Sequence, residues 1–298
     1  MDTMRDRFIA TTTRLLEEDP RLALVLAEIS RDGFEGAARA HPDRVVNVGI
    51  REQLLIGAGA GMALTGMRPF LHTFASFLVE RPFEQVKLDL GHQGVGGVLV
   101  SAGGSYDWPA GGFTHMAPGD VALLDTLDGW TVRVPGHPDE AEAFLEQAAT
   151  GDDRVYVRLS LQSNRAPHPA GPSLSTVRQG TGGVVIAVGP MLDTVLAAVD
   201  GLDVTVLYAT TVRPFDAAGL RRAAGAGRAA DVVIVEPYLA GTSTAVANDA
   251  LADLPHRVLG LGVGQAELRR YGQMADHLAA HGLDPRTLRQ RIAAFVSR

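Results

Sequence analysis

The chain has 298 residues, of which 46% are hydrophobic and 20% charged, and its formal net charge is −7. This composition predicts a soluble globular protein with room for two domains, and its dispersed basic residues argue against binding to nucleic acid or an anionic membrane. The absence of cysteine excludes disulfides, thiolate zinc sites and cysteine nucleophiles. Because the apolar runs are short and the start has no signal-peptide pattern, we expect a cytoplasmic protein.

In the first half of the chain, short β-rich runs alternate with helical patterns. This alternation predicts a mainly parallel sheet covered by helices. The expected strands are residues 22–26, 44–48, 97–100, 130–134 and 154–159. The expected helices are residues 51–65, 74–90 and 138–149.

The pattern dissolves over residues 162–179, a stretch rich in Pro, Ser, Asn and Arg that is typical of an extended linker. A second α/β series follows. Its expected strands are residues 183–188, 204–208, 231–235 and 257–261. Its expected helices are residues 191–199, 216–225, 242–254 and 285–296. The sequence therefore predicts an α/β protein of two domains with mainly parallel sheets covered by helices, residues 1–165 and 180–298, joined by a linker of residues 166–179.

Glu52 lies where ligands bind in open α/β sheets. A strand is expected to end near Val48, Gly49 to make the turn, and a helix to begin near Arg51. This order puts Glu52 in the first helical turn, at the carboxyl end of a strand. The ordinary structural explanation is that an acid there opposes the helix dipole.

The helix that follows Glu52 contains an unusual number of glycines. Gly57, Gly59 and Gly61 each cost about 1 kcal/mol of helix stability relative to alanine. Close approach of another backbone would explain them, and a packed subunit interface would provide such an approach.

A series of short motifs continues along the chain from this point. They are Gly49-Ile50-Arg51-Glu52-Gln53, Thr73-Phe74-Ala75-Ser76-Phe77, Gly111-Gly112-Phe113-Thr114-His115, Val132-Arg133-Val134-Pro135, Val155–Leu159, Arg213-Pro214-Phe215-Asp216 and Val233-Ile234-Val235-Glu236. In order and spacing they resemble the transketolases and their thiamine-diphosphate relatives, over nearly the whole chain. The resemblance implies a pyrimidine-binding domain followed by the family's C-terminal domain.

The resemblance also implies roles for individual residues. Glu52 would be the catalytic acid that hydrogen-bonds N1′ of the cofactor's aminopyrimidine ring. Phe74 and Phe77 would pack against that ring, although both are otherwise ordinary core residues. Glu80 stands where some relatives carry an aromatic residue, and we include it among the expected cofactor-binding residues. His115 would face the substrate and transfer or share a proton with its oxygens.

The half of the site that holds diphosphate and metal is missing from the sequence. In the family that half carries Gly-Asp-Gly followed by an Asn-rich element, whereas this chain has three asparagines and none follows such a turn. The resemblance therefore implies that thiamine diphosphate is shared with a partner chain, an N-terminal transketolase subunit that holds the diphosphate and Mg²⁺, in an α2β2 assembly. We expect no metal ligands in this chain.

The substrate side departs from common transketolases. The sequence has Leu161 where the family often has a phosphate-binding arginine, and Ser101-Ala102-Gly103 where it often has a histidine. An acidic turn of the family is replaced by Trp108–Gly112. We therefore expect a specialised, non-phosphorylated acceptor. Its pocket would be lined by Tyr106, Trp108 and Phe113.

The function expected from the resemblance is transfer of a two-carbon ketol unit from a ketose to an aldehyde-type acceptor. Two alternatives stay open at this point. The chain could be the E1 β subunit of a 2-oxo acid dehydrogenase or of an acyloin-forming enzyme, or it could be a regulatory partner that has lost catalysis.

Overall fold

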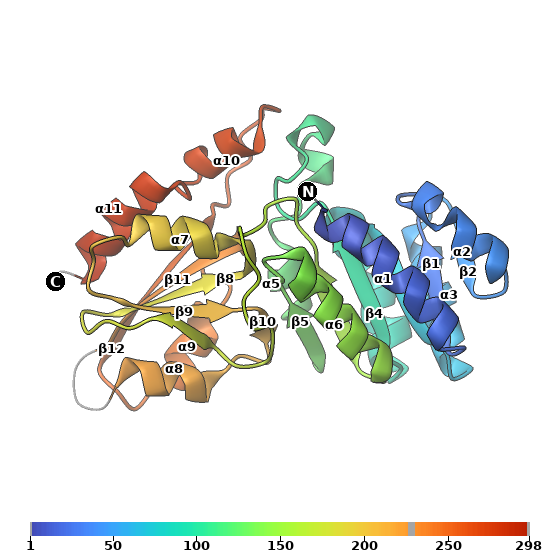
Figure 1. Cartoon of the computed structure of the whole chain (residues 1–298), viewed down its shortest axis with the longest axis horizontal. Helices are drawn as coiled ribbons and strands as arrows, with labels where there is room; N and C mark the ends of the chain where they lie inside the picture. The colour runs from blue at the N-terminus through green and yellow to red at the C-terminus, as the bar shows by residue number, and fades with distance from the viewer. Residues whose placement is uncertain (1, 226–229, 297–298) are drawn as a thin grey trace.

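The computed structural model describes residues 2–225 and 230–296, and two sheets organise them (Figure 1). The strands are β1 (Leu22–Leu26), β2 (Val45–Asn47), β3 (Arg68–Phe74), β4 (Gly97–Ala102), β5 (Trp130–Arg133), β6 (Arg154–Arg158), β7 (Ser175–Arg178), β8 (Val184–Val188), β9 (Thr205–Ala209), β10 (Thr211–Arg213), β11 (Ala230–Leu239) and β12 (His256–Val263). Within the described residues, the first sheet has the order β10-β5-β6-β4-β3-β1-β2 and the second β12-β11-β8-β9-β7. All neighbouring strands are parallel except the edge strands β10 and β7. The expected α/β architecture is confirmed.

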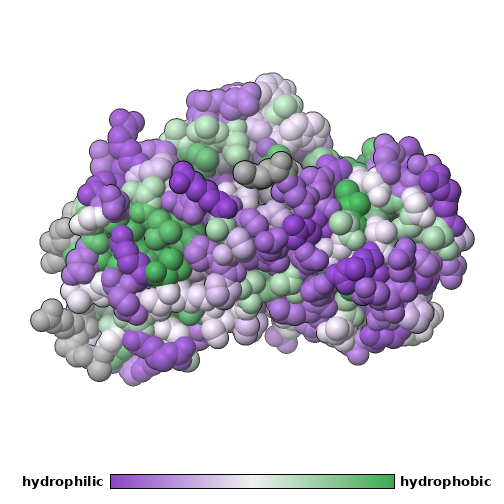
Figure 2. Space-filling model, viewed as in Figure 1, coloured by the Kyte–Doolittle hydropathy of each residue, from purple (hydrophilic) through white to green (hydrophobic). Residues whose placement is uncertain are grey.

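Helices cover both faces of the sheets. They are α1 (Met4–Glu18), α2 (Glu35–Ala40), α3 (Glu52–Leu64), α4 (Phe83–Gln85), α5 (Asp120–Leu124), α6 (Pro138–Thr150), α7 (Leu192–Ala198), α8 (Ala217–Ala224), α9 (Thr244–Ala250), α10 (Met274–Ala280) and α11 (Pro285–Val296). In Figure 1, α1 and α6 lie side by side in front of the first sheet. Figure 2 shows hydrophilic residues over this pair, where Arg7 contacts Asp139 and Glu142 at 2.6 and 2.7 Å. No helix in the described ranges is long and apolar enough to cross a membrane.

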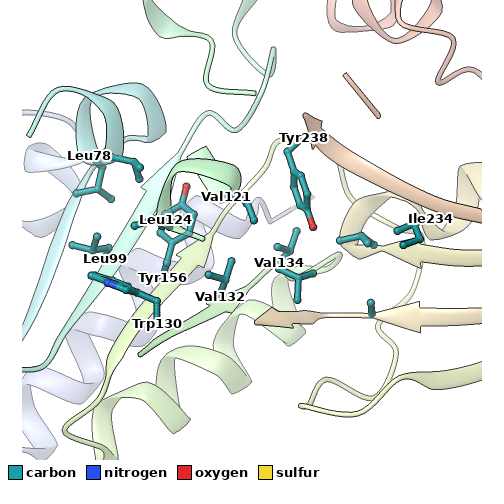
Figure 3. Packing of buried hydrophobic residues seen from close by; sticks show 14 of the residues in the cluster. Leu78, Leu99, Val121, Leu124, Trp130, Val132, Val134, Tyr156, Ile234 and Tyr238 are labelled. Atoms are coloured by element: carbon teal, nitrogen blue, oxygen red, sulfur yellow. The ribbon is translucent and has the colours of Figure 1, made fainter. Parts of the chain in front are cut away.

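The hydrophobic core is continuous between the two sheets. On one face of the first sheet, Leu55 and Ile56 of α3 pack with buried side chains of the strands. The same cluster continues through Val134 to Ile234 and Tyr238 of β11, in the second half of the chain (Figure 3). The two sheets are therefore packed against each other through apolar side chains.

The prediction of an extended linker over residues 166–179 is wrong for its last residues. Residues Ser175–Arg178 form β7, which pairs antiparallel with β9 at the edge of the second sheet. Conversely, β10 of the second half pairs with β5 at the edge of the first sheet. Pairing satisfies backbone groups that an extended segment would leave free, and it makes the two halves share strands.

The single helix expected over residues 74–90 is also wrong. Phe74 is the last residue of β3, and two π-helical turns, Ser76–Glu80 and Val86–His92, flank the short α4. Pro82 lies between the first turn and α4, and its missing N–H interrupts the helical hydrogen bonds. The wider π turn changes where the side chains of residues 76–81 project.

His72 is fully buried in β3 below the edge where Glu52 lies. Its Nδ1 donates to the carbonyl of Val100 at 2.7 Å, so Nε2 accepts from the hydroxyl of Ser30 at 2.8 Å. Burial lowers the pKa of His72 to about 3, from an ordinary value of 6.5. His72 is therefore held inside the sheet by both of its ring nitrogens.

This shift predicts a pH dependence of stability. The unfolded chain binds the His72 proton below pH 6.5 and the folded chain only near pH 3, so the free energy of unfolding falls as pH drops through this window. The slope is about 1.4 kcal/mol per pH unit from this one group. Urea unfolding from pH 8 to pH 4 should show a shallower slope for His72→Gln than for the wild type. The same change at the exposed His92 is the control, and equal slopes for all three proteins would contradict the assignment.

Candidate active site

Glu52 is the first residue of α3 and only 2% exposed. The turn before it uses Gly49 at φ 68°, a left-handed conformation that favours glycine. No side chain caps α3, so the Glu52 carboxylate is not occupied as a helix cap. The prediction that Glu52 lies in the first turn of a helix, at the carboxyl end of a strand, is therefore confirmed.

A cation that the sequence analysis missed lies directly beside Glu52. Arg81 Nη1 donates to Glu52 Oε2 at 2.8 Å, and the guanidinium carbon of Arg81 lies 3.9 Å from the centroid of the Phe77 ring. A buried carboxylate needs a counterion or hydrogen bonds. Arg81 could have been found from the sequence by this need for a counterion, together with the four-residue spacing between Phe77 and Arg81.

Four rings gather next to this ion pair. Trp108 stacks on Phe74 with centroids 5.5 Å apart and planes at 16°. His115 meets Phe74, Phe77 and Trp108 edge-on at 5.3, 4.9 and 4.8 Å. The structure therefore brings together Glu52, Phe74, Phe77 and His115, which the sequence analysis selected from segments far apart in the chain.

The orientation of His115 is set by its own loop. Its Nδ1 lies 3.0 Å from the carbonyl oxygen of Gly111, which can only accept, so Nδ1 carries the hydrogen. In the neutral ring, Nε2 then holds the free lone pair. Among the described residues Nε2 has no hydrogen-bond partner, and it is available to exchange a proton with a substrate.

Glu80 lies at the end of the first π turn, next to Arg81, but its carboxylate makes no hydrogen bond with the part of the chain that is described. Partial burial, and secondarily the carboxylate of Asp120, raise its pKa to about 7. Part of its side chain remains exposed in this single chain. Its proposed contact with the cofactor stays a prediction.

Buried polar groups hold the loop that carries Trp108 and His115. Asp107 accepts from Ser160 Oγ at 2.9 Å and from the Leu161 N–H at 2.8 Å, and burial raises its pKa to about 6. Arg158 donates to Asp120 at 2.7 Å and to Ser105 Oγ at 2.8 Å. These contacts fix both ends of the loop against β6.

A cavity of about 330 Å³ opens beside Phe74. We call it the acceptor pocket, and it is lined by Arg5, Phe74, Ala102, Gly103, Trp108, Leu159, Ser160 and Leu161. Arg5 Nε donates to Ser30 Oγ at 2.9 Å, and within residues 2–225 and 230–296 its guanidinium has no ion-pair partner. Burial lowers the pKa of Arg5, and the neighbouring carboxylate of Asp6 opposes this shift. Arg5 was not among the expected site residues, because it lies on α1, a helix that was not predicted from the sequence.

The three aromatic residues expected to line one pocket lie at two different cavities. Trp108 lines the acceptor pocket, but Tyr106 and Phe113 line a different cavity of about 530 Å³, between the loop and residues 263–281 of the second half. Tyr106 stacks there on His277 and on His281, with centroids 5.6 and 5.7 Å away. The loop residues point alternately to its two sides, which the sequence alone does not reveal.

The residues present fit one half of thiamine diphosphate. A buried carboxylate beside aromatic faces suits an aminopyrimidine ring, which needs a hydrogen-bond partner and a stacking surface. In the described part of the chain, no group of three or more His, Cys, Asp or Glu side chains could hold a metal ion. The aromatic half of the cofactor therefore fits this chain.

Comparison with known proteins agrees with this geometry. Residues 3–166 match the model of the transketolase pyrimidine-binding domain. An uncharacterised 33.6 kDa protein of the fasciation locus of Rhodococcoides fascians is 53% identical over 97% of this chain and 93% of its own length. A 6-deoxy-6-sulfo-D-fructose transketolase subunit of Clostridium sp. strain MSTE9 is 28% identical, over 74% of this chain and 72% of that subunit.

Longer relatives show the same relationship. The 1-deoxy-D-xylulose-5-phosphate synthase of Symbiobacterium thermophilum is 30% identical over 96% of this chain, which spans only 46% of that enzyme. In fold, the chain is similar to a split-gene transketolase solved as an inactive β4 tetramer, with a TM-score of 0.84, 24% identity and coverage of 99% and 98%. The chain belongs to the transketolase family and carries that family's pyrimidine-binding domain in its first half.

Proposed function

We propose that this chain is the pyrimidine-binding subunit of a split, thiamine-diphosphate-dependent transketolase-like enzyme. The observation that carries the proposal is the buried Glu52, which Arg81 connects to Phe77 and the ring cluster. One relative, which matches this chain over 72% of its own length, is itself named a transketolase subunit. The reaction would transfer a two-carbon ketol unit from a ketose to an aldehyde.

Each site residue has a defined task in this proposal. When bound, the cofactor supplies the carbon nucleophile for cleavage and formation of the C–C bond. Glu52 hydrogen-bonds N1′ of the aminopyrimidine, Phe74 and Phe77 contact the ring, and Glu80 lies at its border. His115 Nε2 exchanges a proton with the substrate's oxygen. The aromatic rings keep water away from these groups.

The partner chain would bind along α3 and bring the diphosphate and Mg²⁺ site, in an α2β2 assembly. Ile50, Leu54 and Leu64 are 72%, 50% and 61% exposed. Helical spacing puts Leu54 and Leu64 on the same face of α3 as Gly57 and Gly61, and Ile50 lies in the turn just before the helix. We call these five residues the α3 stripe. A side chain at Gly61 would meet no atom within 4 Å in this chain, whereas one at Gly59 would collide with Leu71. Gly59 therefore serves packing on the sheet, and the open surface at Gly61 allows close approach of the partner.

The acceptor would lie in the acceptor pocket. Its walls are mainly apolar and aromatic, and Arg5 is its one cation among the residues described. This combination suits a specialised, non-phosphorylated aldehyde with an apolar body and one anionic end, such as a carboxylate. Turnover of pentose phosphates at the rate of a housekeeping transketolase would contradict this part of the proposal.

Glu52→Gln tests the catalytic role. In the enzyme reconstituted with its partner, this variant should lower kcat by about 100-fold or more. The reason is that the neutral amide cannot carry the negative charge that the Glu52 carboxylate presents to N1′ of the aminopyrimidine. The control is Glu35→Gln, since Glu35 is also the first residue of a helix but is exposed and paired with Arg39. Unchanged turnover in Glu52→Gln would remove the catalytic claim, and release of CO₂ from a 2-oxo acid would favour the dehydrogenase alternative.

Gly61→Leu tests the interface. The isolated chain should stay folded and gain up to about 1 kcal/mol, because leucine is the better helix former. Association with the partner should be lost in sedimentation velocity, because the side chain fills the space that the partner needs. Gly36→Leu is the matched control, since Gly36 is an equally open helical glycine on α2. Normal assembly of Gly61→Leu would show that the partner binds elsewhere.

Arg5→Met tests the acceptor pocket. With aldehydes that carry a carboxylate, kcat/KM should fall about 10- to 100-fold, the range expected for loss of a hydrogen bond to a charged group. With neutral aldehydes it should change little. Arg7→Met is the control, because Arg7 lies on the same helix but is paired with Asp139 and Glu142. Equal losses for both classes of aldehyde would assign Arg5 a structural role instead.

A further inference from the structure

Arg81 occupies a defined position above the Phe77 ring. Its guanidinium is planar and cationic, lies 3.9 Å from the ring centroid, and donates to Glu52 Oε2 at 2.8 Å. The backbone supports this position, because the Arg81 N–H donates to Ser76 O at 3.2 Å and Gln53 Nε2 donates to Arg81 O at 3.3 Å. One side chain therefore bridges the aromatic face and the buried acid.

An aminopyrimidine held by Glu52 and Phe77 would need the same two contacts. It is a planar ring that stacks on an aromatic face and presents a ring nitrogen to the carboxylate. Both groups cannot occupy the space between Phe77 and Glu52 at once. We propose that the Arg81 guanidinium takes the place of the aminopyrimidine in the unloaded chain and must leave when the cofactor binds. This inference rests on the proposed function of Glu52.

The charges around the pair explain why the contact forms and how it can open. Glu52 is 2% exposed and would be a buried, uncompensated charge without Arg81. The Arg81 side chain is 38% exposed and forms no second ion pair with the described residues, so it can turn into solvent. The neighbouring Glu80 forms no ion pair with Arg81. The ion pair protects the acid before assembly and competes with the ring afterwards.

Competition of this kind lowers the apparent affinity for the ring by the fraction of molecules in which Arg81 has turned away. The affinity of the isolated chain for 4-amino-5-hydroxymethyl-2-methylpyrimidine measures this directly. This probe lacks the diphosphate and therefore does not need the partner chain. Calorimetric titration of Arg81→Ala should give a Kd at least about tenfold lower than that of the wild type.

The control is Arg39→Ala, which removes the exposed partner of Glu35 on α2 and should bind like the wild type. Arg81→Lys keeps the charge for Glu52 but lacks a planar group over Phe77, and it should bind with intermediate affinity. It also covers the case in which Arg81→Ala does not fold. The double variant Glu52→Gln/Arg81→Ala should show no gain, because it lacks the acid that the ring needs.

A variant without Arg81 that binds the probe no tighter than the wild type, or does not bind it at all, would overturn the inference. If Arg81→Ala does not fold, Arg81→Lys binding no tighter than the wild type would do so. The experiments distinguish failure of this inference from failure of the proposed function. If Glu52→Gln abolishes turnover while the Arg81 variants bind no tighter, the proposed function stands and the inference about Arg81 is wrong. If Glu52→Gln leaves turnover unchanged, the proposed function itself fails.

Discussion

The burial of the Glu52 carboxylate is the constraint on which the rest of the site depends. A charge that is 2% exposed must be matched, and in this chain Arg81 matches it from the turn that follows β3. That turn must place Arg81 over Phe77 and Phe77 beside His115, so β3, the π turn and the loop after β4 have to converge at one edge of the sheet. The parallel order of the sheet provides this convergence, because the strands β2, β3 and β4 end at the same edge.

The second half of the chain supports this edge from the other side. Ser105 at the start of the loop hydrogen-bonds to the carbonyl of Pro237 in β11, and Arg213 of β10 pairs with Asp125 at the end of α5. Together with the continuous core around Val134 and Tyr238, these contacts join the loop of His115 to the second sheet. The proposed roles in assembly and in catalysis are therefore physically linked, since displacing the second sheet would move the loop.

Much of this could be predicted from the sequence. The bounds of β1 and α11, and the place of Glu52 in the first turn of α3, were predicted correctly because hydrophobic periodicity and turn residues determine them locally. Other features depend on the tertiary structure. Residues 76–92 form π turns interrupted at Pro82, and this irregular geometry decides where Arg81 projects. Arg5 reaches the acceptor pocket from a helix whose mixed charges hid its pattern, and only the fold shows that Tyr106 and Phe113 face a separate cavity.

The most direct test of the account is a crystal structure of this chain with its partner, thiamine diphosphate and Mg²⁺. We expect an aminopyrimidine over Phe77 within hydrogen-bond distance of Glu52, with Arg81 turned away from the carboxylate. We also expect the partner chain to hold the diphosphate and metal across the α3 stripe. An aminopyrimidine away from Glu52, or a diphosphate bound by the same chain as the ring, would contradict it.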